Sequence, residues 1–247
     1  MVMIENSQVR VLVADDNEIN QYVIREILET DGYLVDTVCD GDHIIPTMES
    51  NHYDLIIMDC LMPVMDGFTA TKAIRISDTG SFDPDIPILA VTALSDPEDP
   101  SQCLESGMDD YISKPVVPSE LLRRVSRLLN DAGKPGLAQI RKQNQQGPKN
   151  FDFSNIIETL SKTIVRDIQG WQYEMEAWLN SGSFKELGAL AHKIRGTADV
   201  LGDSILSNYC LSLEASVKAG NTDQLAGLTE IIVTQLKELG GALRSRS

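Results

Sequence analysis

The sequence predicts two domains of different class, an α/β domain with a parallel sheet followed by an all-α helical bundle. Short, almost wholly apolar segments alternate with amphipathic ones up to residue 130, and no strand pattern follows residue 151. A stretch rich in Gly, Pro and Gln separates the two halves. Apolar strands that alternate with helices are typical of a parallel sheet covered on both faces. We therefore divide the chain into a domain over 1–130, a linker over 131–150 and a helical domain over 151–247.

Five strands are expected in the first domain, because five short apolar runs occur there. These runs are VRVLVAD, YLVDTV, DLIIMD, PILAVTA and DYIS. The helical stretches between them start with EINQYVIREILET and end with SELLRRVSRLL. Pro46 is expected to interrupt the second helix, whereas Pro97 and Pro100 shorten the fourth helix, which begins near Asp99. The run ISDTGSFDPDIP is expected to form a long acidic loop before the fourth strand.

The second domain shows only helical patterns, which indicates a helical bundle. The helices are expected at 154–167, 170–180, 183–201, 203–219 and 222–240. The linker before them carries Gly, Pro, Gln and Lys without an apolar period, as flexible connections do.

Charge and composition exclude several classes of function. Residues 1–130 carry 8 Lys or Arg against 24 Asp or Glu, so this domain has a net charge of −16 and is not expected to bind nucleic acid. No apolar run approaches the length of a membrane span, and the N-terminus lacks the layout of a signal peptide. The four cysteines are scattered and form no zinc motif. We expect a cytoplasmic chain with reduced thiols and no direct membrane contact.

Charged and hydroxyl side chains end or follow four of the five strands at the same edge of the predicted sheet, where ligands bind in open parallel sheets. They are Asp15, Asp16, Asp59, Thr92 and Lys114. Three converging carboxylates repel one another, and a hard divalent cation, best Mg²⁺, relieves that repulsion. Asp16 alone could instead be a helix N-cap. A metal, a lysine and a hydroxyl are the groups that hold a phosphoryl group in transfer, with Asp59 as the acceptor.

The runs VLVADDNEIN, DLIIMDCLMPVMDGFTA, ILAVTAL and GMDDYISKPV resemble the receiver domain of two-component response regulators and hybrid sensor kinases. The resemblance covers about residues 8–130. It implies a flavodoxin-like, doubly wound five-stranded parallel sheet. It also implies that Asp59 is phosphorylated and that Thr92 and Lys114 bind the phosphoryl oxygens.

The same resemblance implies a metal site and a switch. Mg²⁺ would be held by Asp15, Asp16, Asp59 and the backbone carbonyl of Leu61. Tyr111 is similar to the aromatic residue that turns inward when the threonine moves, so the resemblance makes Thr92 and Tyr111 the switch pair. The bond between Lys114 and Pro115 is expected to be cis.

The run GALAHKIRG, Gly188 to Gly196, places one histidine between two glycines in a predicted helix. At 100° per residue, an apolar face that includes Leu187 and Ile194 lies opposite His192. We therefore expect His192 to face solvent, either as an ordinary surface residue or as a reactive one. Glycines cost a helix about 1 kcal/mol each against alanine, so their presence suggests clearance for a docking partner. Lys193 and Arg195, together with Gly188 and Gly196, complete the expected docking set.

The run AHKIRGTADVLG resembles the histidine phosphotransfer (HPt) domain over about residues 152–240. The resemblance implies an HPt-type helical bundle with His192 as the phosphoryl carrier. Arg195 stands where that family usually has lysine, which keeps the charge.

Together the two resemblances predict a phosphorelay, in which a histidine kinase core phosphorylates Asp59 and His192 passes the group to a separate response regulator. We find no kinase catalytic core, and the chain looks like the C-terminal part of a hybrid sensor histidine kinase; a free-standing protein is the alternative. A receiver whose helical bundle only binds partners remains open. An aspartate-nucleophile phosphatase is disfavoured, because the first strand lacks a D-x-D pattern.

Overall fold

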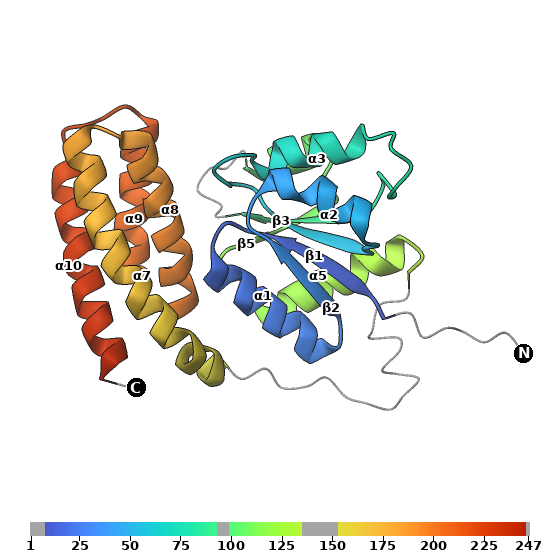
Figure 1. Ribbon diagram of the computed structural model, residues 1–247, viewed down its shortest axis with the longest axis horizontal. Helices are drawn as coiled ribbons and strands as arrows, with labels where there is room; N and C mark the ends of the chain where they lie inside the picture. Colours follow the sequence, from blue (N-terminus) through green and yellow to red (C-terminus); the bar gives the residue numbers. More distant parts are fainter. Residues whose placement is uncertain (1–7, 93–98, 135–152, 246–247) are drawn as a thin grey trace, which may run out of the picture. The chain divides into compact units, whose positions relative to one another are not determined.

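The computed structural model describes residues 8–92, 99–134 and 153–245 (Figure 1). The chain forms two units, Met1–Phe151 and Asp152–Ser247. No helix among the described residues is long and apolar enough to cross a membrane.

The first unit is built on a five-stranded sheet in which every neighbouring pair of strands is parallel. Its strands are β1 (Arg10–Ala14), β2 (Leu34–Val38), β3 (Leu55–Asp59), β4 (Ile88–Thr92) and β5 (Asp110–Ser113). Their spatial order is β2-β1-β3-β4-β5, the doubly wound order of flavodoxin-like folds. The predicted fold class is therefore confirmed, and each strand lies within its predicted apolar run.

Helices cover both faces of this sheet. They are α1 (Glu18–Asp31), the 3₁₀ turn η1 (Gly41–His43), α2 (Ile44–Ser50), α3 (Gly67–Arg75), α4 (Asp99–Glu105) and α5 (Pro118–Asp131). Helices α1 and α5 lie on one face, and α2 and α3 lie on the other (Figure 1). Alternate strand residues supply the two cores, and Leu12, Ile56 and Ile88 pack against the α2 and α3 side. All five residues of β3 and of β4 are buried, which explains their unbroken apolar sequence.

The predictions made from the prolines have different outcomes at α4 and α2. Helix α4 begins at Asp99, as predicted. Pro46, in contrast, lies in the first turn of α2 and does not interrupt it, because the backbone N–H groups of a first helical turn need no partner within the helix.

The end of the first unit reaches slightly into the predicted linker. Helix α5 ends at Asp131, and the ammonium of Lys134 lies 3.1 Å from a carboxylate oxygen of Asp54. The remainder of the predicted linker, 135–150, lies outside the described residues.

The acidic loop between α3 and β4 is tied down by one side chain, that of Arg75. Its guanidinium donates to the backbone carbonyls of Pro84 (2.5 Å), Ile86 (2.9 Å) and Gly107 (2.9 Å), and to the carboxylate of Asp109 (2.9 Å). The loop is thus an ordered part of the receiver-like unit despite its composition.

The second unit is a four-helix bundle. Its helices are α7 (Phe153–Ser181), α8 (Phe184–Leu201), α9 (Ser204–Lys218) and α10 (Leu225–Arg244). Each helix packs against its neighbours in the chain, and α10 closes the ring against α7 (Figure 1). The bundle confirms the all-α prediction, but the break predicted before residue 170 is wrong. Gly170 lies within α7, where a Cβ atom would meet open space, and buried Ile168 and Trp171 flank it in the continuous helix.

Candidate functional site

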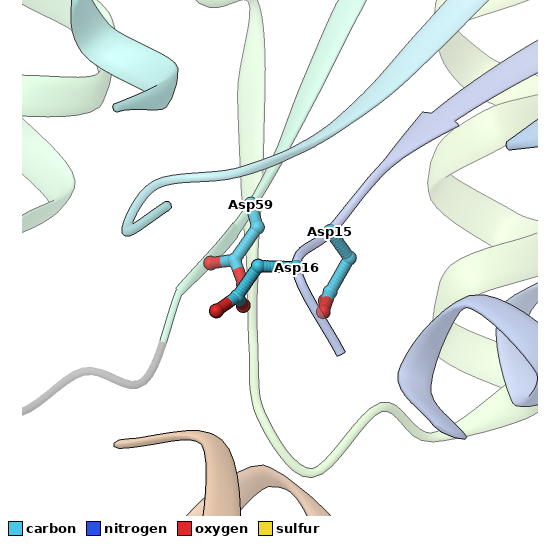
Figure 2. A group of neighbouring side chains, drawn as sticks. All are labelled: Asp15, Asp16 and Asp59. Carbon is cyan, nitrogen blue, oxygen red and sulfur yellow. The ribbon is translucent and has the colours of Figure 1, made fainter. Parts of the chain in front are cut away.

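The carboxyl ends of the strands gather the predicted acidic residues at one edge of the sheet. Asp15 and Asp16 follow β1, and Asp59 is the last residue of β3, which pairs with β1. Figure 2 shows the three carboxylates next to one another, and one oxygen from each lies within 4.8 Å of the others. The convergence that the strand pattern predicted is therefore present.

Lys114 supplies the positive charge at this site. Its Nζ donates to Asp59 Oδ2 at 2.6 Å and to Asp15 Oδ2 at 3.1 Å. Burial alone would lower the pKa of this ammonium, but the two carboxylates outweigh burial and raise the pKa above its ordinary value. Lys114 therefore stays charged, and it joins β1 and β3 from the end of β5. Its bond to Pro115 is cis, as the resemblance implied.

Burial and neighbouring charges both act on the carboxyl group of Asp15. Its side chain is buried, and burial raises its pKa to about 7, with Lys114 lowering it and Asp59 and Asp16 raising it further. Asp15 Oδ1 accepts hydrogen bonds from the backbone N–H of Asn17 (2.9 Å) and from the side-chain amide of Asn20 (3.2 Å). Even so, one ammonium does not balance three acidic groups.

The donor set fits a hard divalent cation. Asp15, Asp16 and Asp59 offer only oxygen ligands, which Mg²⁺ prefers, and a cation there would relieve the repulsion that raises the pKa of Asp15. Leu61 lies at the same place, since its backbone N–H donates to Asp59 Oδ1 at 3.2 Å. The three predicted carboxylate ligands therefore lie together, and the backbone carbonyl of Leu61 stays a predicted ligand.

The predicted switch pair lies on the two strands beside β3. Thr92 is buried at the end of β4 and is paired in register with Ser113 of β5. Tyr111, also on β5, is half-buried, and the guanidinium of Arg124 lies 5.8 Å from the centre of its ring. The contact with Arg124 gives the aromatic ring a partner at the surface that sequence alone did not reveal.

His192 forms the centre of a second polar cluster, on α8 and α9 of the other unit. Its Nδ1 lies 3.0 Å from Glu214 Oε2 and 3.1 Å from Arg195 Nη2. Arg195 also donates hydrogen bonds to Glu214, from Nε to Oε1 (2.6 Å) and from Nη2 to Oε2 (3.0 Å). Burial would raise the pKa of Glu214, but the hydrogen bonds and charges of His192 and Arg195 together lower it. Glu214 is therefore an anion between two basic groups.

This cluster can prepare the imidazole for nucleophilic attack. When Nδ1 carries the proton, it donates to Glu214 and leaves the lone pair on Nε2. In the other tautomer, Arg195 is placed to donate to Nδ1. Within this cluster, sequence reasoning missed Glu214. Its only signal was an acidic residue one helical turn after the buried Cys210 of α9.

The surroundings of His192 differ from the expectation of an open, glycine-flanked ring. Its side chain is only 14% exposed, because α9 covers one side of α8. Gly188 faces that neighbour, and a Cβ atom there would lie 3.1 Å from Val217 Cγ1. Gly196 and Arg195 are buried. The glycine at 188 therefore serves helix packing, and Arg195 serves the ion pair. Lys193, like Gly188, is half-buried.

Comparison with known proteins concerns the first unit. A family model described as the response regulator receiver domain matches residues 11–126 and ends before the helical unit. Hybrid signal transduction histidine kinase B of Dictyostelium discoideum is 36% identical over 121 residues, which cover 46% of this chain but only 6% of that protein. Probable transcriptional regulator ycf27 of Cyanidium caldarium is 33% identical over 165 residues, 65% of this chain and 60% of that protein.

The chain is also similar to solved structures. The receiver domain of sensor histidine kinase PA1611 from Pseudomonas aeruginosa PAO1, solved with a magnesium ion coordinated in its active site cleft, is 39% identical. The similarity covers 50% of this chain and 99% of that domain, with a TM-score of 0.46.

Proposed function

Residues 11–126 form a response regulator receiver domain, and on that premise we propose that the chain relays a phosphoryl group through Asp59 and His192. The observation that carries the proposal is the contact of Asp59 with Lys114 among two further carboxylates. A carboxylate held against a buried ammonium is placed to accept a phosphoryl group whose oxygens that ammonium can then bind.

The first transfer is from a phosphohistidine of a histidine kinase core. A carboxylate oxygen of Asp59 attacks the phosphorus, a P–O bond forms, the P–N bond breaks, and the imidazole nitrogen leaves with the electron pair. Lys114 stays on the reacting carboxylate and offsets the charge of the phosphoryl oxygens, and the Thr92 hydroxyl is proposed to donate to one of them. A divalent cation held by Asp15, Asp16 and Asp59 would supply further neutralisation of that charge.

The second transfer takes the group from the acyl phosphate to His192. Nε2 attacks the phosphorus, a P–N bond forms, and the Asp59 carboxylate leaves as the P–O bond breaks. Glu214 accepts a hydrogen bond from the protonated Nδ1 of His192 and stabilises the positive charge that the ring acquires. The same chemistry in reverse passes the group to an aspartate of a separate response regulator. Histidine kinase and response regulator are therefore the proposed partners.

Replacing the acceptor tests the first transfer. In the full chain, Asp59→Asn is expected to abolish Mg²⁺-dependent labelling by a small phosphodonor, because an amide oxygen forms no stable acyl phosphate. Acid-quenched samples resolved on a gel with phosphate stain measure the label. Undiminished labelling of Asp59→Asn would show that another residue is the acceptor.

Replacing the carrier tests the second transfer. With a phosphorylated receiver supplied, wild-type chain is expected to gain acid-labile, base-stable label, which is the signature of phosphohistidine. His192→Gln keeps a polar side chain of similar length and should lose that label. Persistence of the label would assign the role to another histidine.

The partial burial of His192 favours one alternative, a bundle that binds partners without carrying phosphate. In that case the Glu214–Arg195–His192 cluster is only a structural link between α8 and α9. The two functions separate cleanly: a binding module binds its response regulator equally well as wild type or His192→Gln and never acquires base-stable label.

A further inference from the structure

Asp40, two residues after the end of β2, has a buried carboxylate that accepts no hydrogen bond from its own helix. It occupies the N-cap position of η1, yet its side chain makes no capping bond there. Aspartate at such a position usually accepts from the first helical N–H groups. Instead its two oxygens accept from the backbone N–H of Val64 (3.0 Å) and of Met65 (2.8 Å).

Those two N–H groups belong to the loop that starts at the phosphoacceptor. The loop, 60–66, connects β3 to α3. Its near end is tied to Asp59, because the N–H of Leu61 donates to Asp59 Oδ1 at 3.2 Å. Its far end closes where Gly67 donates to the carbonyl of Cys60 at 3.0 Å. Asp40, in the segment after β2, therefore holds the later part of the loop through Val64 and Met65.

Gly41 also lies against this loop, at Met65. A Cβ atom on Gly41 would lie 2.4 Å from the carbonyl oxygen of Met65, a contact that no side chain tolerates. The N–H of Met65 is thus held by a carboxylate, and its C=O packs on the one residue type that leaves it room. Hydrogen bonds from N–H groups to a carboxylate are stronger than those to a neutral acceptor. Asp40 and Gly41 together therefore fix the backbone position of Met65.

We propose that Asp40 is a positioning residue for the chemistry at Asp59. By fixing Val64 and Met65, its carboxylate sets the path of the loop 60–66. That path places Leu61, whose N–H contacts Asp59 and whose carbonyl is the expected fourth metal ligand. The inference rests on the proposed metal-dependent phosphorylation of Asp59, and it adds a group that never touches the phosphoryl group itself.

The test measures metal binding without any phosphodonor. Mn²⁺, which shares the oxygen ligands of Mg²⁺, is titrated into the full chain and free Mn²⁺ is followed by electron paramagnetic resonance. Asp40→Ala removes both acceptors and is expected to weaken Mn²⁺ binding about 10- to 100-fold, as loss of groups that orient metal ligands does. Asp40→Asn keeps one acceptor oxygen and should recover part of the affinity. Gly41→Ala, which keeps Asp40 but displaces Met65, should weaken binding as well.

A second readout separates positioning from the transfer step. The rate of Asp59 labelling is measured against Mg²⁺ concentration. For Asp40→Ala, the Mg²⁺ needed for half the maximal rate should rise by the same factor as the Mn²⁺ dissociation constant, and excess Mg²⁺ should restore part of the rate.

Asp36→Ala is the matched control. Asp36 lies on β2 and accepts from Arg10 (2.6 Å) and Tyr53 (2.9 Å), so its loss weakens the same strand without touching the loop. Its Mn²⁺ affinity should equal that of wild type. Equal Mn²⁺ affinity of Asp40→Ala and wild type overturns the role of Asp40, as does an equal loss in Asp36→Ala. Failure of the wild-type chain to bind Mn²⁺ overturns the metal site together with it.

Discussion

The two polar clusters of this protein balance their charges in opposite ways. Around Asp59, three carboxylates lie together, the ammonium of Lys114 contacts Asp15 and Asp59, and burial raises the pKa of Asp15 to about 7. Around His192, one carboxylate, Glu214, lies between two basic groups, and its pKa is lowered. The first cluster carries excess negative charge and is suited to a cation. The second is satisfied by its own side chains.

In the proposed relay, one phosphoryl group is held at these two unlike sites. An acyl phosphate at Asp59 would add negative charge to a place already rich in it, so we expect the receiver unit to depend on Lys114 and on a metal. A phosphohistidine at His192 would form on a ring whose Nδ1 already contacts an anion. We therefore expect changes to the two clusters to have separable effects.

The largest effect is expected from removing the ammonium of the first cluster. In Lys114→Met, Asp15 and Asp59 face each other without their shared cation, and the developing charge of the transfer is left unsupported. The rate of labelling by a small phosphodonor should fall about 10²- to 10³-fold, as it does when one charge-stabilising donor is lost. Lys72→Met, on the exposed face of α3, is the control. A similar rate in both variants would contradict the role of Lys114.

Removing the anion of the second cluster should cost stability as well as transfer. Glu214→Ala leaves Arg195 buried without its partner, which should lower the free energy of unfolding of the bundle by about 3 kcal/mol. Urea titration followed by tryptophan fluorescence reports on this unit alone, because both tryptophans lie in α7. Glu186→Ala, on the exposed face of α8, is the control. An unchanged midpoint would mean that the ion pair adds nothing.

A bulky side chain at position 188 distinguishes packing from clearance. Gly188→Leu should destabilise the bundle by about 1–3 kcal/mol, because the new side chain overlaps Val217. The double variant Gly188→Leu, Val217→Ala should regain part of that loss. If Gly188→Leu slows transfer to His192 while the urea midpoint is unchanged, the glycine instead gives room to a docking partner.

Metal should stabilise one unit and not the other. At a Mg²⁺ concentration ten times its dissociation constant, the receiver unit gains about 1.4 kcal/mol, which raises its melting temperature by a few degrees. The bundle should show no shift. Calorimetry resolves the receiver transition and tryptophan fluorescence the bundle transition. A shift of both, or a shift that survives in Asp16→Asn, would argue against a site confined to the three carboxylates.

The smallest effect is a pH dependence of opposite sign in the two units. Glu214 has a lowered folded pKa, so it stabilises the bundle above its unfolded value of about 4.3, and that contribution is lost as pH falls below it. Asp15 has a raised folded pKa, so the metal-free receiver unit loses stability as pH rises from about 4 to 7. Melting curves of Glu214→Gln and Asp15→Asn measure each contribution. Slopes equal to those of wild type would refute it.

Most of the receiver unit could be predicted from the sequence because its strands and the residues that end them appear as short local patterns. Buried parallel strands are read directly as apolar runs, and the residue after each run lies at the shared edge of the sheet. Asp59 and Lys114 could be found in this way. Asp40 could not, since its partners are backbone groups 24 and 25 residues away that leave no mark in the side-chain pattern.

The bundle was harder to predict because its helices are buried on more than one side. A helical wheel assigns one apolar face, so it placed His192 in solvent, whereas α9 covers part of the opposite face. The break expected before residue 170 does not form, because the cost of Gly170 in a helix, about 1 kcal/mol, is smaller than the gain from burying Ile168 and Trp171 in a continuous helix. Glu214 was missed because its partners lie on another helix.

The hydrogen bonds of Arg75 affect how readily a protease can cleave this protein. By composition, the acidic loop between α3 and β4 is the kind of segment that is nicked first. A protease needs an extended backbone, and extending this loop requires the guanidinium to give up the carbonyls of Pro84 and Ile86. Cleavage beside Pro84 and Ile86 is therefore expected to require local opening, so the rate of nicking at that point reports how often this part of the receiver unit opens.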